Sequence, residues 1–234
     1  MVQLEDLKHR WQVAPKAEYW CDRTLNLYKT PIDPGLVTQA AAGRQLRITA
    51  IEPTGIHVIL RADDYPGWLR LEDMDALIPA AAPYQSPTVM RQDIEQVIPD
   101  AIAFTQAAMA TPNEYLWGGT VAPNYDCSGL MQAAFAAVGV PLPRDSYQQE
   151  AFTKTIDKTE LLPGDLIFFG TPERTTHVAL HIGDGQYIHS SGKDQGRNGI
   201  GIDSITDLAD PVSRTYAAQY RCCGRIMEGY TPAE

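Results

Sequence analysis

Residues 80–87 (AAAPYQSP) constrain the fold more than any other feature, because they separate two parts of the chain with different hydrophobic patterns. Before them, residues 17–79 contain short alternating runs interrupted by turn signals, which is typical of short β-strands in a small barrel. After them, residues 89–111 show the apolar spacing of a helix. The change of pattern predicts two domains, a small β-barrel over residues 1–85 and a second domain over residues 86–234.

The second domain is predicted to be α+β, with helices packed on a mainly antiparallel sheet. Pro99 falls inside its first helix, and we expect it to kink or split that helix. Residues 126–139 (DCSGLMQAAFAAVG) begin with an N-capping aspartate and end with a C-capping glycine, so a helix is expected there with Cys127 in its first turn. Strand-like runs follow, separated by glycine-containing turns, at residues 166–169, 177–182, 187–190 and 224–228.

Composition limits the classes of function. The four cysteines show no C-x-x-C spacing, so we expect free thiols and no metal or other cofactor. The formal charge of −10, without basic patches, argues against nucleic-acid binding. No run of about 18 apolar residues and no signal-peptide pattern is visible, which predicts no membrane association and a cytoplasmic protein. Three of the cysteines are assigned no function: Cys21, Cys222 and Cys223.

Cys127 is the candidate nucleophile. The thiolate is the reactive form of cysteine, so a catalytic cysteine needs surroundings that favour the anion. The first turn of a helix contributes at most about 2 kcal/mol to that preference, which leaves the thiol only partly ionised near pH 7. A second partner is therefore needed, and we expect a neighbouring imidazolium to lower the pKa of Cys127 further.

The partner is sought in residues 177–192 (HVALHIGDGQYIHSSG), an apparent β-hairpin with three of the five histidines. Successive side chains of a strand point to opposite faces, so the loop decides which histidines share a face. An odd loop, formed by residues 183–185, would place His177 and His189 on the same face. An even two-residue loop would place them on opposite faces.

With the odd loop, the chemistry is acyl transfer. His177 would take the proton from Cys127, and His189 would hold the His177 ring in position. The thiolate would attack a carbonyl, and the resulting tetrahedral oxyanion would collapse to a thioester that water hydrolyses. The Cys127 backbone N–H and the Tyr115 hydroxyl are the expected oxyanion donors.

Short motifs in a fixed order then give a resemblance to a known family. The motifs are YLWGG at 115–119, DCSGL at 126–130, LPGDLIFF at 162–169, HV at 177–178, IHS at 188–190 and, in the first domain, DYPGWL at 64–69. With these motifs, residues 95–228 resemble the NlpC-type cell-wall cysteine peptidases, a papain-like group, and residues 17–79 look like the bacterial SH3-like domain often attached to them. The resemblance implies a papain-like catalytic domain preceded by a small SH3-like β-barrel.

The resemblance also implies an activity. It is hydrolysis of the γ-D-glutamyl bond to a diamino acid, such as meso-diaminopimelate, in peptidoglycan stem peptides. The motif positions give Cys127, His177 and His189 as the triad and Tyr115 as an oxyanion donor. A cytoplasmic enzyme of this kind would act on free peptides during cell-wall recycling.

In relatives with this layout the SH3-like domain narrows the cleft, so that only a peptide with a free N-terminal L-alanine fits. By position, the alanine pocket would be lined by Asp126, Ser128 and Ser146 of the catalytic domain and by Tyr65 of the SH3-like domain. A carboxylate facing the substrate ammonium is physically sensible there, because an unpaired buried charge is costly.

Several alternatives stay open at this point. The family often has tyrosine at the position of His181, so His181 remains a rival for some catalytic role. Another papain-like amidase or acyltransferase activity, or a wall-peptide binding module without catalysis, is also compatible with the pattern. Some relatives use an acidic residue of the SH3-like domain, and four candidates are not separated: Asp63, Asp64, Glu72 and Asp73.

Overall fold

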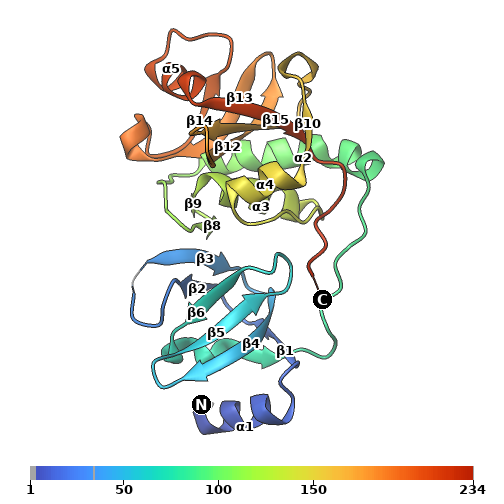
Figure 1. The fold of residues 1–234 in the computed structure, drawn as a ribbon, viewed down its shortest axis with the longest axis vertical. Helices are drawn as coiled ribbons and strands as arrows, with labels where there is room; N and C mark the ends of the chain where they lie inside the picture. Colours follow the sequence, from blue (N-terminus) through green and yellow to red (C-terminus); the bar gives the residue numbers. More distant parts are fainter. Residues whose placement is uncertain (1–3, 34, 234) are drawn as a thin grey trace. The chain divides into compact units, whose positions relative to one another are not determined.

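The computed structural model describes residues 4–33 and 35–233. The chain divides into two compact units, Met1–Ser86 together with Thr231–Glu234, and Pro87–Tyr230 (Figure 1). The last four residues group with the first unit, whereas one boundary near residue 85 would assign them to the second.

The first unit consists of helix α1 (Leu4–Val13), a 3-10 turn (Leu71–Ala76) and a seven-stranded antiparallel sheet in the order β3-β2-β6-β5-β4-β1-β7. Buried and more exposed residues alternate along much of β4 and β5, as expected for strands with one face in a core. Leu7 of α1 is buried in that core with Leu46 and Val58. The strands are β1 (Glu18–Cys21), β2 (Leu25–Tyr28), β3 (Leu36–Ala40), β4 (Gln45–Glu52), β5 (Gly55–Leu60), β6 (Pro66–Leu69) and β7 (Leu77–Pro79).

The second unit is built on a six-stranded antiparallel sheet in the order β10-β15-β11-β12-β13-β14, with a small β8–β9 ribbon beside it. Its strands are β8 (Thr120–Val121), β9 (Asn124–Tyr125), β10 (Lys154–Ile156), β11 (Leu166–Gly170), β12 (Thr175–Gly183), β13 (Gln186–Ser191), β14 (Gly199–Ser204) and β15 (Tyr220–Arg225). Its helices are α2 (Arg91–Ala110), α3 (Cys127–Ala137), α4 (Ser146–Phe152) and α5 (Pro211–Ala218). This mixture of helices and antiparallel sheet confirms the predicted α+β class.

The two faces of this sheet pack against different helices (Figure 1). On one face, Val178 and Leu180 join a core with residues of α2 and α3. On the other face, Phe169 and Ala179 pack with Tyr216 of α5. Alternate residues of β12 therefore point toward α3 or toward α5.

Helix α2 is not split at Pro99, although a split was one of the two expected outcomes. It runs unbroken through the proline, because Ile94, Ile98 and Ala101 on both sides of it are buried in the core. Packing of this apolar stripe compensates for the backbone hydrogen bond that a proline cannot donate.

Candidate active site

Helix α3 places Cys127 at its first residue. The Asp126 side chain caps the helix by accepting a hydrogen bond from the Gly129 backbone N–H at 2.6 Å. The backbone N–H groups of Val178 and Ser128 hydrogen-bond to the Cys127 sulfur. Because Val178 follows His177 directly, the sulfur lies against the strand that carries the predicted base.

The hairpin of β12 and β13 puts both predicted catalytic histidines on one face, but not through the expected loop. The turn has two residues, Asp184 and Gly185, both with positive φ, between the paired Gly183 and Gln186. Taken alone, this even turn would separate the histidines.

A β-bulge between His181 and Gly183 adds one residue to β12 and restores the register, so that Leu180 lies opposite Ile188 and His181 opposite Tyr187. The prediction of a three-residue loop was therefore wrong, whereas the strand register derived from it is observed.

The His177 and His189 rings are in direct contact. His177 Nε2 lies 2.7 Å from His189 Nδ1, and His189 Nε2 lies 2.7 Å from Oδ2 of Asp203. His177 is 7% exposed and His189 is fully buried. The contact brings the two predicted residues together, and Asp203, which sequence reasoning missed, extends it.

Burial governs the protonation of both histidines. It lowers the pKa of His177 well below its ordinary value, and the neighbouring His189 acts in the same direction. Burial also lowers the pKa of His189, although the Asp203 carboxylate opposes that shift. Both rings are therefore neutral at pH 7 in the resting protein.

The Cys127 thiol is also neutral at rest, which contradicts the expected lowering of its pKa. Burial raises the pKa of Cys127 to about 12, and the Asp126 carboxylate adds to the shift. The Val178 and Ser128 N–H groups and Arg144 act in the opposite direction but do not outweigh burial. The directions of these pKa shifts oppose a resting thiolate–imidazolium pair.

Two tyrosines lie near the thiol. Burial raises the pKa of Tyr115, with a smaller contribution from Cys127, so its hydroxyl stays protonated and can donate a hydrogen bond. The Tyr216 ring stacks on the His177 ring with centroids 4.4 Å apart. The hydroxyl of Tyr216 is 2.7 Å from Ser191 Oγ. Sequence reasoning proposed Tyr115 and missed Tyr216, whose place follows only from the packing of α5.

Asp126 has a partner that the sequence did not reveal. Arg144, which is 1% exposed, contacts Asp126 at both carboxylate oxygens, at 3.1 and 2.6 Å, and donates to Ser128 Oγ at 3.0 Å. Asp126 also accepts the backbone N–H groups of Gly118 and Gly129. The structure thus brings Asp126 and Ser128 together, and it commits the carboxylate to Arg144.

The remaining predicted residues are placed as follows. Ser146 is the first residue of α4 and is 7% exposed. Tyr65 belongs to the first unit, where its backbone N–H donates to Asp63 Oδ1 at 3.3 Å. The pocket roles of Ser146 and Tyr65 stay predictions. His181 is buried, and its Nδ1 has no hydrogen-bond partner among the described residues, so its role also stays open.

The four acidic candidates of the first unit each lie near an arginine. The pairs are Asp63–Arg44 at 2.9 Å, Asp64–Arg61 at 3.3 Å, Glu72–Arg70 at 3.5 Å and Asp73–Arg23 at 3.8 Å.

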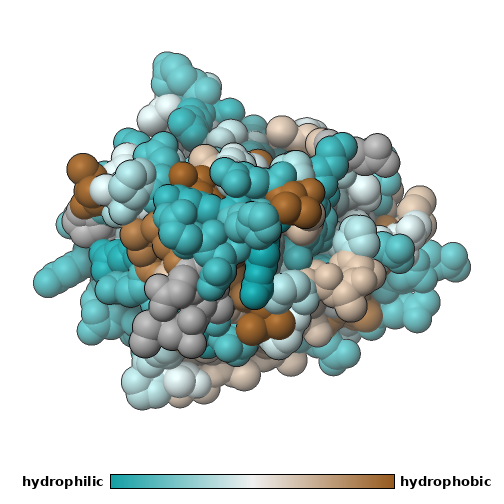
Figure 2. Space-filling model, turned by 90° about the horizontal axis from the view of Figure 1, so that it is seen from below, coloured by the Kyte–Doolittle hydropathy of each residue, from teal (hydrophilic) through white to brown (hydrophobic). Residues whose placement is uncertain are grey.

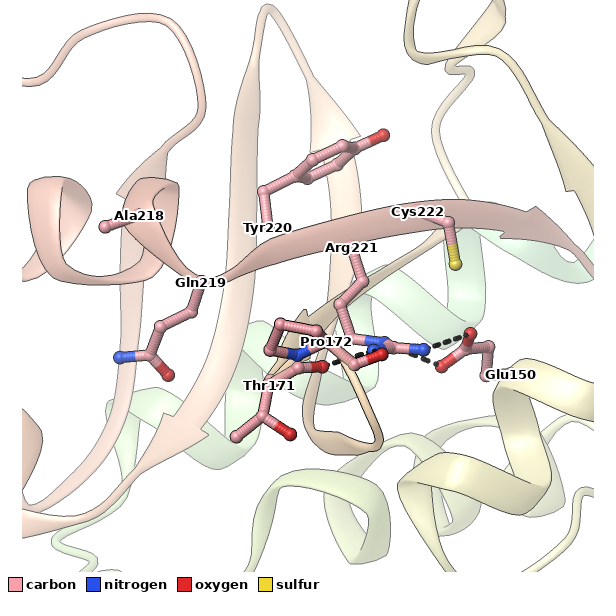
Figure 3. Close-up of a pocket in the computed structure, with 9 residues that line it drawn as sticks. Glu150, Thr171, Pro172, Ala218, Gln219, Tyr220, Arg221 and Cys222 are labelled. Atoms are coloured by element: carbon pink, nitrogen blue, oxygen red, sulfur yellow. Dashed lines mark hydrogen bonds and ion pairs between the residues drawn. The ribbon is translucent and has the colours of Figure 1, made fainter.

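An open pocket of about 430 Å³ in the second unit is built around Arg221 (Figure 3). The guanidinium donates to the Thr171 and Pro172 carbonyl oxygens and pairs with Glu150 of α4 at 3.3 Å. None of the residues that line this pocket is a predicted catalytic residue. Because most of the Arg221 guanidinium N–H groups already donate to other groups of the protein, we interpret Arg221 as a structural link between the β11–β12 loop and α4.

The described part of the chain contains no cluster of three or more His, Cys, Asp or Glu side chains arranged to hold a metal ion. Within residues 4–33 and 35–233, no helix has the length and apolar character needed to cross a membrane. On the face shown in Figure 2, apolar residues form small separate patches among hydrophilic ones.

Comparisons with known proteins agree with this architecture. Residues 112–223 match the NlpC/P60 family, and residues 27–74 match the bacterial dipeptidyl-peptidase Sh3 domain. A gamma-D-glutamyl-L-lysine dipeptidyl-peptidase of Bacillus cereus is 42% identical over 79 residues, which are 32% of this chain and 24% of the relative. A probable endopeptidase NlpC homolog of Haemophilus influenzae is 41% identical over 109 residues, which are 46% of this chain and 54% of the relative.

Among solved structures, a crystal structure of an NlpC/P60 family protein from Bacillus cereus aligns with a TM-score of 0.48 and 24% identity, covering 94% of this chain and 66% of that one. The matches to the two curated relatives span at most 54% of their own lengths. By the two family matches, the chain contains a domain similar to the NlpC/P60 family over residues 112–223, preceded by one similar to the bacterial dipeptidyl-peptidase Sh3 domain over residues 27–74.

Proposed function

We propose that this protein is a cysteine peptidase that hydrolyses the γ-D-glutamyl bond to a diamino acid in peptidoglycan stem peptides with a free N-terminal L-alanine. The observation that carries the proposal is the 2.7 Å contact between His177 Nε2 and His189 Nδ1, on the strand against which the Cys127 sulfur lies. This arrangement supplies a nucleophile, a base and a group that orients the base. The curated name of the Bacillus cereus relative supports the choice of bond.

The first step couples proton transfer to attack. Because thiol and imidazole are both neutral at rest, His177 takes the Cys127 proton as the sulfur attacks the γ-carbonyl carbon. A C–S bond forms, and the carbonyl oxygen becomes an oxyanion. The Cys127 backbone N–H and the Tyr115 hydroxyl donate to that oxyanion.

The second half of the reaction returns the proton. The C–N bond breaks, and the amine of the diamino acid leaves with the proton held by His177. Water, activated by His177, then attacks the thioester, which releases the γ-carboxyl group and restores the Cys127 thiol. His189 and Asp203 stabilise the positive charge that forms on His177 in both halves.

The alanine pocket would use Asp126, Ser128 and Ser146 of the second unit. Because Asp126 already pairs with Arg144, a substrate ammonium would share that carboxylate with the guanidinium. Ser128 Oγ accepts from Arg144 at 3.0 Å and lies within the same polar cluster. Discrimination between a free and a blocked amine is therefore the sharpest test of this pocket.

The test uses L-Ala-γ-D-Glu-meso-diaminopimelate and its N-acetylated form as substrates, with release of the diamino acid followed by mass spectrometry. We expect release from the free peptide only, and loss of release in Cys127→Ala. Cys222→Ala, which removes a partly buried thiol of the second unit, should retain the parent rate.

Equal release from both peptides would contradict the alanine pocket, and activity in Cys127→Ala would contradict the nucleophile. If the parent and Cys127→Ala bind the peptide equally and neither cleaves it, the binding-module alternative is correct.

We also propose that the enzyme acts in the cytoplasm on free stem peptides, as part of cell-wall recycling. A requirement for a free L-alanine amine supports this, because such peptides are fragments and not intact wall. Cell fractionation with an antibody to the protein tests the location, and recovery mainly outside the cytoplasmic fraction would overturn it.

A further inference from the structure

We propose that Asp203 is a positioning residue that fixes which ring nitrogens of His189 and His177 carry protons, so that Nδ1 of His177 is left as the base for Cys127. The inference rests on the proposed role of His177 as a base. It adds Asp203 to the predicted triad of Cys127, His177 and His189. Asp203 lies in none of the sequence motifs that gave those three residues.

The first step of the argument is the state of the Asp203 carboxylate. Its side chain is 1% exposed, and Arg197 contacts both oxygens, Nε at 3.0 Å and Nη2 at 2.7 Å. Burial acts to raise the pKa of Asp203, but the hydrogen bonds from His189 and Arg197 outweigh it and hold the pKa below its ordinary value. An ionised carboxylate can only accept hydrogen bonds, so the proton in the 2.7 Å contact sits on His189 Nε2.

The second step follows from the chemistry of a neutral imidazole, which has one N–H donor and one acceptor nitrogen. Since His189 Nε2 is the donor, His189 Nδ1 is the acceptor. The proton in the 2.7 Å contact between the rings therefore belongs to His177 Nε2. His177 Nδ1 is then left with a free lone pair.

The third step is the direction of that lone pair. Nδ1 is the ring nitrogen nearer the main chain, and the Cys127 sulfur is hydrogen-bonded by the backbone N–H of Val178, the residue after His177. Stacking of Tyr216 on the His177 ring, at 4.4 Å and 30° between planes, restrains rotation of the ring. With the opposite tautomer, the lone pair of His177 would face His189, and the thiol would have no base.

The sheet is shaped to allow this arrangement. Asp203 lies opposite Tyr187 and Gly201 opposite His189, so Asp203 and His189 are diagonal neighbours on one face. A Cβ at Gly201 would come within 2.6 Å of Arg197 Cδ and Nη1. The glycine therefore leaves the space through which Arg197 reaches Asp203.

The direct test is a long-range proton–nitrogen correlation spectrum of the protein labelled with ¹⁵N-histidine, recorded without substrate at pH 7.5. We expect the Nε2–H tautomer for both His177 and His189, with signals assigned through His177→Asn and His189→Asn. A proton on Nδ1 of His189 would overturn the inference, whatever the variants do.

The matched variants are Asp203→Asn and Asp210→Asn. In Asp203→Asn the new side-chain amide can donate to His189 Nε2 and thereby reverse both tautomers, so we expect kcat to fall about 100-fold, the low end of a general-base contribution, with little change in KM. Asp210 caps α5 by accepting from the Val212 and Ser213 N–H groups, and asparagine caps a helix equally well. Asp210→Asn should therefore keep the parent kcat and spectrum.

A third readout separates this inference from the proposed function. Alkylation of Cys127 by iodoacetamide needs the same base but no peptide. If the parent cleaves no stem peptide, yet shows the expected tautomers and Asp203→Asn slows alkylation, the substrate is wrong and the inference stands. If the peptide is cleaved, but Asp203→Asn has the parent kcat and tautomers, the inference is wrong and the function stands.

Discussion

Buried charges in the second unit occur as close ion pairs. Arg144 and Asp126 approach to 2.6 Å, and Arg225 lies 2.7 Å from the buried carboxylate of Asp165. A buried charge that loses its partner is strongly destabilising, because neither water nor a counter-charge then compensates it. Each of these carboxylates depends on its arginine for a stable place in the fold.

Replacing Arg144 tests this dependence. Arg144→Met leaves the Asp126 carboxylate buried without a counter-charge, and we expect the free energy of unfolding to fall by about 3–5 kcal/mol. Urea unfolding measures the change. Glu95→Gln is the control, since Glu95 is 58% exposed and its pair with Arg91 is worth at most about 0.5 kcal/mol. A change below about 1 kcal/mol in Arg144→Met would show that Asp126 finds another partner.

The two buried histidines of the candidate site, His177 and His189, make stability depend on pH. Their pKa values are lower in the folded chain than the unfolded value of about 6.5, so below that pH the unfolded chain binds more protons. The contribution of these two histidines to the free energy of unfolding should be constant above about pH 7 and fall as the pH drops below 6.5, by up to about 1.4 kcal/mol per pH unit for each histidine. Urea unfolding between pH 5 and 8 measures the slope, which should be smaller in His177→Asn/His189→Asn. Equal slopes would contradict the assignment.

At the scale of single elements, periodicity and capping signals predicted much of the second unit. The helix expected over residues 126–139 is α3, because Asp126 caps it and Gly139, with φ 81°, follows its end. Helix α1 was not predicted, since its mixed composition gives a weak apolar stripe with Leu7 as its buried residue. The turn type and the bulge of the hairpin could not be predicted either, because the same sequence is compatible with two loop geometries.

The hairpin turn offers a test at this scale. Asp184 has φ 51°, which asparagine tolerates and a β-branched residue does not. We expect Asp184→Val to lower the free energy of unfolding by about 1–2 kcal/mol and Asp184→Asn to change it little. Urea midpoints of the two variants decide the matter, and equal midpoints would mean that the turn relaxes to another type.

At the scale of the whole molecule, the chain has separate hydrophobic cores. The core with Leu46 draws its residues from the first unit alone, whereas the cores with Leu180 and Phe169 draw theirs from the second. The change of pattern near residue 85 predicts two domains, and the structure has two compact units. The partners of the candidate-site residues were not predictable, because strand order and the packing of α5 bring them together from distant positions: Arg144, Arg197, Asp203 and Tyr216.

Separate cores predict separate responses to damage. Leu46→Ala removes a fully buried side chain and should destabilise the first unit by about 2–5 kcal/mol. Amide hydrogen exchange followed by mass spectrometry should then rise in residues 18–79 and stay unchanged in β11 to β14. Leu180→Ala should give the reverse pattern. A rise throughout the chain in either variant would show that the two units unfold together.

The bulge in β12 has a consequence for comparing sequences of this kind. Successive side chains of a strand point to alternate faces of the sheet, and a single unpaired residue reverses this alternation for the residues beyond it. Counting residues between His177 and His189 therefore gives the correct face only when the turn and the bulge are counted together. A relative whose hairpin is one residue shorter can keep its two imidazoles in contact if the residue it lacks is the bulge residue. A one-residue gap in an alignment of this hairpin therefore does not show that the site is lost.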